Sequence, residues 1–198
     1  TEKCNRIKLP HGNSWVEIYS SIPEEIQLSE KKYKQLWNEH PDELSTGKMF
    51  GKTITFPRWQ QSYGKTLRFA GQDCEGAPIE NDSMKKLLKW VNKHSKLSFN
   101  SCFVNWYKNG NHYIGEHADK TQQLVKNSPI YSFSFGQERE FVIRSKDKTY
   151  TKTIPMKSNS LIIMGGEMQK YYKHSVPKRS VKKCPKSRIN VSFRLFKS

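Results

Sequence analysis

Hydrophobic positions in the first half of the chain recur every three or four residues in two segments, which is the spacing of one helix face. In the first segment, Tyr33, Leu36 and Trp37 share such a face. Ser29 is a suitable N-cap for this helix, and Pro41 would end it. We therefore expect a first helix between Ser29 and Pro41.

The second segment divides more sharply into two sides. Its hydrophobic side consists of Met84, Leu87, Leu88 and Val91. Its polar side consists of Lys85, Lys86, Lys89 and Lys93. This pattern predicts a helix that packs on a sheet, with either Asp82 or Ser83 as its cap.

From Phe99 onward the period changes to two, which indicates strands. The alternating segments are 99–107, 130–135, 140–144, 150–154, 160–164 and 187–196. They predict a β-sandwich or barrel. Between the two helices, residues 42–75 are rich in glycine and aromatic residues, as expected for a loop-rich insertion or lid.

The composition adds a strong positive charge to this picture. The 198 residues include 35 Lys and Arg against 18 Asp and Glu, a formal net charge of +17. Nucleic acid is the natural partner for such a chain, although some basic proteins are simply soluble cations. At this length we expect one domain.

The cysteines and apolar runs indicate an intracellular protein. Four scattered cysteines form no C-x-x-C pair, which argues against a secreted disulfide framework. The longest apolar runs, such as 161–164, are far shorter than the roughly 20 residues that span a bilayer. The chain begins at Thr1 rather than Met, which is compatible with an upstream segment that the sequence does not show.

One short motif has the composition of a metal site. His117 and Asp119 are two residues apart, so in extended backbone both side chains leave the same face. Among the other histidines, His174 is the best candidate for a third ligand. Two His and one carboxylate leave open positions on non-haem iron(II). An H-x-D tripeptide alone is also common among ordinary surface or turn residues.

The last predicted strand sorts its residues almost completely by polarity. Arg188, Asn190, Ser192 and Arg194 share one face, and the other face is hydrophobic. Such a strand either exposes its arginines to solvent or turns them into an anion-binding cavity, where guanidinium groups can grip carboxylates.

Together these motifs resemble the AlkB dioxygenases, and especially their animal DNA and RNA repair members. The resemblance rests on the H-x-D pair, on His174 and on the R-x-N-x-x-x-R ending at 188–194. It extends to the N-W-Y element at 105–107 and the S-P-I-Y-S-F-S-F-G strand at 128–136. It covers about residues 47–198.

The resemblance implies an α+β fold. Its core would be a double-stranded β-helix, or jelly-roll, over residues 99–198, with flanking helices. Residues 42–75 would form a nucleotide-recognition lid, and the whole chain, 1–198, would be a single catalytic domain. The resemblance also implies iron(II) held by His117, Asp119 and His174.

The resemblance further implies 2-oxoglutarate as cosubstrate. Arg188, with Tyr107 and Asn190, would hold its far carboxylate, while Asn105 and Arg194 would lie nearer the metal. A buried dianion requires such cations and donors. No catalytic side chain beyond the iron centre is required.

The activity implied is oxidative demethylation of N-alkylated bases in DNA, and of RNA as a second possibility. It would consume dioxygen and release formaldehyde, succinate and carbon dioxide. The alternative is the same chemistry on a methylated RNA mark or a protein side chain. We expect a monomer that binds no membrane and is intracellular, with the nucleus as one location.

Several positions would contact the substrate. Phe50 would be a wedge that fills the gap left by a flipped base, although loop aromatics are often simply packed. Arg58 would hold the displaced backbone. Leu67 and Phe69 would flank the damaged base. Thr121 stands where close relatives have an acidic residue, and Leu67 where a relative has an aromatic one, so the preferred lesion is open.

A basic tail precedes the last strand. Its charged residues are Lys178, Arg179, Lys182, Lys183 and Lys186. This tail resembles a phosphate-contacting loop at the mouth of the site. A solvated run of charge or a nuclear address are equal alternatives.

Overall fold

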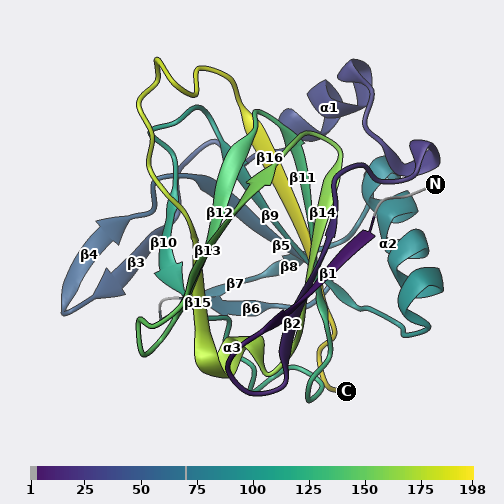
Figure 1. The fold of residues 1–198 in the computed structure, drawn as a ribbon. Coiled ribbons are helices and arrows are strands. Elements are labelled where there is room, and N and C mark those ends of the chain that lie inside the picture. Colours follow the sequence, from purple (N-terminus) through teal and green to yellow (C-terminus); the bar gives the residue numbers. More distant parts are fainter. Residues whose placement is uncertain (1–3, 70) are drawn as a thin grey trace.

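The computed structural model describes residues 4–69 and 71–198, in which two β-sheets face each other. The longer helices lie to one side of the pair, and a β-hairpin projects on the opposite side (Figure 1). The α+β class with a sheet core is therefore confirmed.

The large sheet has eight strands in the described part of the chain. Their spatial order is β1 (Cys4–Leu9), β2 (Ser14–Tyr19), β14 (Ser160–Gly166), β11 (Ile130–Gly136), β16 (Arg188–Arg194), β9 (Ser101–Tyr107), β5 (Trp59–Tyr63) and β8 (Gly76–Ala77). The last long strand, β16, is central, because it pairs antiparallel with β11 on one side and with β9 on the other.

The small sheet lies across from the large one. Its strands are, in spatial order, β10 (Ile114–His117), β15 (Tyr172–Val176), β12 (Arg139–Ser145) and β13 (Thr151–Met156). Two separate hairpins consist of β3 (Thr46–Met49) with β4 (Lys52–Thr55), and of β6 (Leu67–Phe69) with β7 (Gln72–Cys74).

The helices begin close to the predicted positions. In α1 (Glu30–Trp37), the Ser29 side chain accepts a hydrogen bond from the Lys32 N–H, as predicted, but the helix ends before Pro41. In α2 (Asp82–Ser95), the cap is Asn81 rather than Asp82 or Ser83. The short elements η1 (Glu24–Ile26) and α3 (Met168–Tyr171) were not predicted.

The alternation of β16 separates a hydrophobic core from a polar cavity. Ile189, Val191 and Phe193 belong to the core shared with residues of α1 and α2. On this side, the Trp106 indole N–H donates to the Leu36 carbonyl at 3.0 Å, which ties α1 to the sheet. The opposite face of β16 points between the two sheets, where Arg188 is buried rather than exposed.

Strand pairing extends beyond two of the predicted segments, the sheet core at 99–198 and the insertion at 42–75. The sheet core does not begin at residue 99, because β2 pairs with β14 and brings β1 with it. The segment 42–75 is not only an insertion, because β5 within it pairs with β9 of the large sheet. In both places, pairing with a distant strand decides the structure.

Two further observations concern the cysteines and the helix lengths. All four cysteines are free thiols. Among the described residues, no helix is long and apolar enough to cross a membrane.

Candidate metal and cosubstrate site

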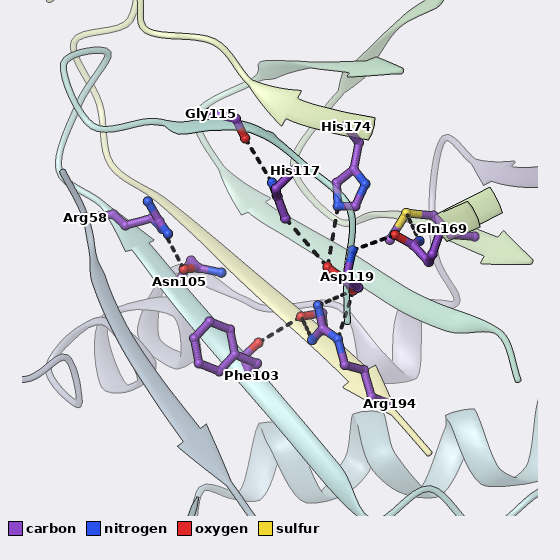
Figure 2. A network of polar contacts seen from close by, with 11 residues as sticks. Arg58, Phe103, Asn105, Gly115, His117, Asp119, Gln169, His174 and Arg194 are labelled. Atoms are coloured by element: carbon purple, nitrogen blue, oxygen red, sulfur yellow. Dashed lines mark hydrogen bonds and ion pairs between the residues drawn. The ribbon is translucent and has the colours of Figure 1, made fainter. Parts of the chain in front are cut away.

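Three predicted ligands meet at one end of the space between the sheets. His117 ends β10 and pairs directly with His174 on β15. The Nε2 atoms of these two histidines lie 3.6 and 3.8 Å from Oδ1 of Asp119. One ligand atom from each residue lies within 4.8 Å of the others, so the group could hold a metal ion (Figure 2).

Neighbouring groups orient His117 and Asp119 (Figure 2). The His117 Nδ1 lies 2.9 Å from the Gly115 carbonyl, which leaves Nε2 as the atom for a metal. Arg194 donates from Nε and Nη2 to Oδ2 of Asp119, at 3.0 and 2.7 Å. The backbone N–H of Asp119 donates to Oε1 of Gln169 at 2.8 Å.

The electrostatics favour ligand forms that bind metal. Burial alone would raise the pKa of the Asp119 carboxyl, but the Arg194 guanidinium and the two imidazoles hold it well below its usual range. Burial lowers the pKa of His174 to about 3, and it also lowers the pKa of His117. An ionised carboxylate and two neutral imidazoles are the forms that donate electron pairs to a cation.

A cavity of about 260 Å³ extends from these ligands to Arg188. Arg188 is 1% exposed, its Nη2 donates to the Ser134 hydroxyl at 3.0 Å, and its guanidinium carbon lies 4.9 Å from the centre of the Tyr107 ring. Among the described residues, its Nε and Nη1 have no hydrogen-bond partner. Buried donors without partners are costly, and a carboxylate at this end of the cavity would give the guanidinium a charged acceptor. The cavity thus fits 2-oxoglutarate, whose chelating end would face the metal ligands.

The two predicted asparagines line the same cavity. The Nδ2 of Asn190 donates to the Ser132 hydroxyl at 2.8 Å and to the Phe133 carbonyl at 2.9 Å, which fixes the amide between β16 and β11. Asn105 pairs with Asn190 across β9 and β16. The predicted cosubstrate residues are therefore brought together, and their roles remain predictions.

Arg58 does not lie where a contact with a displaced strand requires. It is 3% exposed, its Nε donates to Oδ1 of Asn105 at 3.1 Å, and its Nη1 donates to the Tyr113 carbonyl at 3.1 Å. A side chain buried in this way cannot reach a phosphate on the surface. Arg58 instead holds Asn105 in place, so our expectation for its role was wrong.

The other predicted substrate residues are distributed around the cavity mouth. Leu67 lines the cavity. The side chain of Phe69 lies outside the described part of the structure. Thr121 is exposed and lines a neighbouring groove rather than the cavity. Their contacts with a substrate stay predictions.

Phe50 forms the tip of the projecting β3–β4 hairpin (Figure 1). Its φ of 49° and the φ of 76° at Gly51 form a turn with positive φ at two successive positions, typical of two-residue hairpin loops. The side chain of Phe50 is 97% exposed, and neighbouring Met49 is 48% exposed. The alternative of a packed aromatic therefore does not hold within this chain.

Two residues near the ligands were not found from the sequence. Gln169 belongs to α3, whose four residues are too few to give a periodic signal. Lys120 lines the cavity next to Asp119 and could have been found from that adjacency. The backbone of the H-x-D motif is therefore held at Asp119 by α3, which lies far from the motif in the sequence.

Known proteins share this fold and sequence pattern. A family model described as the 2OG-Fe(II) oxygenase superfamily matches residues 16–194. The human DNA oxidative demethylase ALKBH2 is 33% identical over 162 residues, covering 76% of this chain and 61% of the relative. The Arabidopsis thaliana DNA oxidative demethylase ALKBH2 is 30% identical over 218 residues, covering 96% and 68%.

A second group of relatives gives a similar match. The human Alpha-ketoglutarate-dependent dioxygenase alkB homolog 3 is 29% identical over 195 residues, covering 93% of this chain and 67% of the relative. The chain spans between 57% and 66% of the length of the mammalian ALKBH2 proteins. Among solved structures, OsALKBH1 superposes with a TM-score of 0.57 at 18% identity, covering 91% of this chain and 96% of that one, which is a likeness of fold.

Proposed function

Because the chain belongs to the AlkB family of the 2OG-Fe(II) oxygenase superfamily, we propose that it removes methyl groups from base nitrogens in DNA, and in RNA as a second substrate. Methylated base, dioxygen and 2-oxoglutarate would yield the repaired base, formaldehyde, succinate and carbon dioxide. Bound iron(II) and 2-oxoglutarate would supply the oxidising chemistry. The alternative substrates are a methylated RNA mark and a protein side chain.

The observation that carries this proposal is the cavity with its two chemically different ends. His117, Asp119 and His174 lie at one end, and Arg188 lies at the other. Arg188 would hold the far carboxylate through a guanidinium nitrogen that has no hydrogen-bond partner among the described residues. Asn105 lines the same cavity and would orient the cosubstrate, while Arg194 contacts Asp119 and orients its carboxylate.

The apolar part of the cavity wall would exclude water from the reacting groups. The rings of Phe141 and His174 stack with their centres 5.3 Å apart. The sulfur of Met156 lies 3.4 Å from Nη2 of Arg188. Hydroxylation of the methyl carbon would give a hemiaminal, which releases formaldehyde without a protein acid or base. The chain therefore needs to position the base rather than move protons.

Nucleic acid as substrate is supported by three independent features. The net charge is +17, two relatives are named as DNA oxidative demethylases, and Phe50 stands exposed at a hairpin tip. A methyl group inside a duplex is reached only if the base is extruded, and an apolar wedge can fill the resulting gap. Phe50 would be that wedge.

The substrate class is tested with oligonucleotides that contain 1-methyladenine or 3-methylcytosine, single and double stranded. We expect a mass decrease of one methylene unit with equimolar formaldehyde. If neither oligonucleotide changes while succinate still forms, the alternative substrates are favoured over base repair.

The wedge is tested with Phe50→Ala. Turnover of duplex substrate should fall far more than turnover of single strands, because only the duplex leaves a gap to fill. Leu97→Ala, an exposed residue just after α2 that is 39% exposed, is the matched control and should change neither. Equal losses on duplex and single strand would contradict the wedge.

A further inference from the structure

A groove of about 740 Å³ lies next to the cavity, on the other side of the segment that follows Asp119. One wall is the loop 120–128, and the other is the turn 165–170, which includes the start of α3. Its apolar floor includes Leu124, Ile130 and Met164. Of the three predicted metal ligands Asp119 alone lines this groove, and Phe50 at the hairpin tip does not line it.

Both walls are held by hydrogen bonds to distant parts of the chain. In the loop, the Val125 N–H donates to the Leu195 carbonyl at 2.9 Å, and the Gln123 carbonyl accepts from the Lys197 N–H at 2.9 Å. In the turn, the Glu167 carboxylate accepts from the Asn13 N–H at 3.0 Å. The groove is therefore a formed part of the fold rather than a space between loose loops.

The groove is rimmed by positive charge. Five exposed lysines line it, namely Lys120, Lys126, Lys146, Lys170 and Lys197. Among the residues that the structure describes, two acidic ones line it. Glu167 is bonded to Asn13 and lies 3.4 Å from the Lys170 ammonium, and Asp119 is bonded to Arg194. Positive charges gathered around a concave surface attract anions, and several lysines around one groove suit a ligand that carries several phosphates.

The groove and the cavity share a wall. Asp119, Lys120 and Met164 line both. A polymer whose base enters the cavity could therefore continue directly into the groove, with Lys120 at the junction. A small free anion would occupy only one of these two spaces, whereas a polymer can occupy both.

From this geometry we propose that the groove binds the phosphodiester backbone of the target strand, on one side of the base that enters the cavity. The inference rests on the proposed function for its ligand, but it adds a second contact surface. The wedge hairpin acts on the gap in a duplex, whereas the groove acts on single strands too. Longer strands should therefore bind better than short ones.

The test is a double variant, Lys126→Gln with Lys170→Gln, whose side chains lie away from the metal ligands. The probes are unmodified single-stranded DNA of three and of fifteen nucleotides. For the longer strand we expect roughly tenfold weaker binding, and a slope of log affinity against log salt smaller by about 0.7 per lost contact. Binding of the three-nucleotide strand should fall much less, because it has fewer phosphates to place in the groove.

The matched control is Lys85→Gln with Lys89→Gln, on the exposed face of α2. It removes the same charge and should retain wild-type binding. If both double variants lose affinity equally, or if neither does, the groove is not a strand-binding surface. Thermal unfolding of each variant separates a loss of binding from a loss of fold.

Failure of this inference differs from failure of the proposed function. If wild-type protein demethylates bases while the groove variant binds long strands normally, only the groove proposal falls. If no methylated base is turned over but the groove variant alone binds the long strand less tightly, the groove stands and the reaction must be revised.

Discussion

Arg194, at the end of the central strand β16, donates two hydrogen bonds to the one oxygen of Asp119 that points away from the histidines. This contact leaves Oδ1 directed at the Nε2 atoms of His117 and His174. The strand whose polar face lines the cavity thus also orients a predicted metal ligand.

The first prediction concerns this contact. Arg194→Lys keeps the charge but cannot make both bonds from a planar group, so Asp119 should be less well oriented. We expect the affinity for Mn(II), used as an air-stable substitute, to fall about tenfold. Calorimetric titration measures it. Arg144→Lys, whose partner Glu116 lies on the surface, is the control. Unchanged affinity in Arg194→Lys would show that the contact has no orienting role.

The second prediction concerns Gln169, whose side-chain oxygen accepts a hydrogen bond from the Asp119 N–H. Gln169→Ala removes this acceptor and should weaken Mn(II) binding by about threefold to tenfold, since a neutral hydrogen bond contributes about 0.5–1.5 kcal/mol. Gln169→Glu retains an acceptor oxygen and should restore most of the affinity. Equal losses in both variants would point to a general disturbance of α3 instead.

The third prediction concerns Arg188. Arg188→Lys should weaken 2-oxoglutarate binding by roughly tenfold to a hundredfold, because hydrogen bonds to charged groups contribute about 1.5–3 kcal/mol. Metal affinity should hardly change, because Arg188 lies at the other end of the cavity. Titration of 2-oxoglutarate into the Mn(II)-loaded variant separates the two effects. A parallel loss of both affinities would mean that the cavity had collapsed.

The fourth prediction concerns the turn between β14 and α3. Gly166 has a φ of 64°, and a Cβ there would lie 1.8 Å from the Asn13 carbonyl oxygen. Gly166→Ala should therefore destabilise the fold by at least about 2 kcal/mol, a fall in Tm of about 4–8 °C. Gly51→Ala has a similar φ of 76° but no atom within 4 Å of its Cβ, so it should cost only about 1 kcal/mol. Equal costs would mean that backbone strain alone decides.

The fifth prediction concerns the metal ligands. Anaerobic protein with iron(II) and 2-oxoglutarate should show a weak visible charge-transfer band, and His174→Ala should lose it. His11→Ala provides the control, because His11 contacts Tyr172 and Asp147 away from the cavity. A normal band in His174→Ala would refute the ligand assignment.

The features that were predictable from the sequence are those that neighbouring residues determine. The alternation along β16 predicted one polar and one hydrophobic face, with the burial of the polar face left open, and Ser29 predicted the start of α1. His117 and Asp119 were found as candidate metal ligands because they are two residues apart in the sequence.

The features that were not predictable depend on distant pairing. The edge strand β1 has mostly exposed positions and no clear alternation, and it forms because it pairs with β2. The burial of Arg58 depends on Asn105 in another strand, and Gln169 reaches Asp119 only in the folded chain. The spacing of residues along the sequence does not indicate such long-range contacts.

The central position of β16 also restricts how this chain can change over generations. Its odd-numbered positions must be hydrophobic because they face the core, and its even-numbered positions must be polar because they face the cavity. Pairing with β11 on one side and β9 on the other fixes its register. Gain or loss of a single codon between Arg188 and Arg194 would place the two arginines on opposite faces of the strand, so one guanidinium would be turned toward the hydrophobic core. Substitutions can accumulate there one at a time, whereas a change in length would remove architecture and chemistry together.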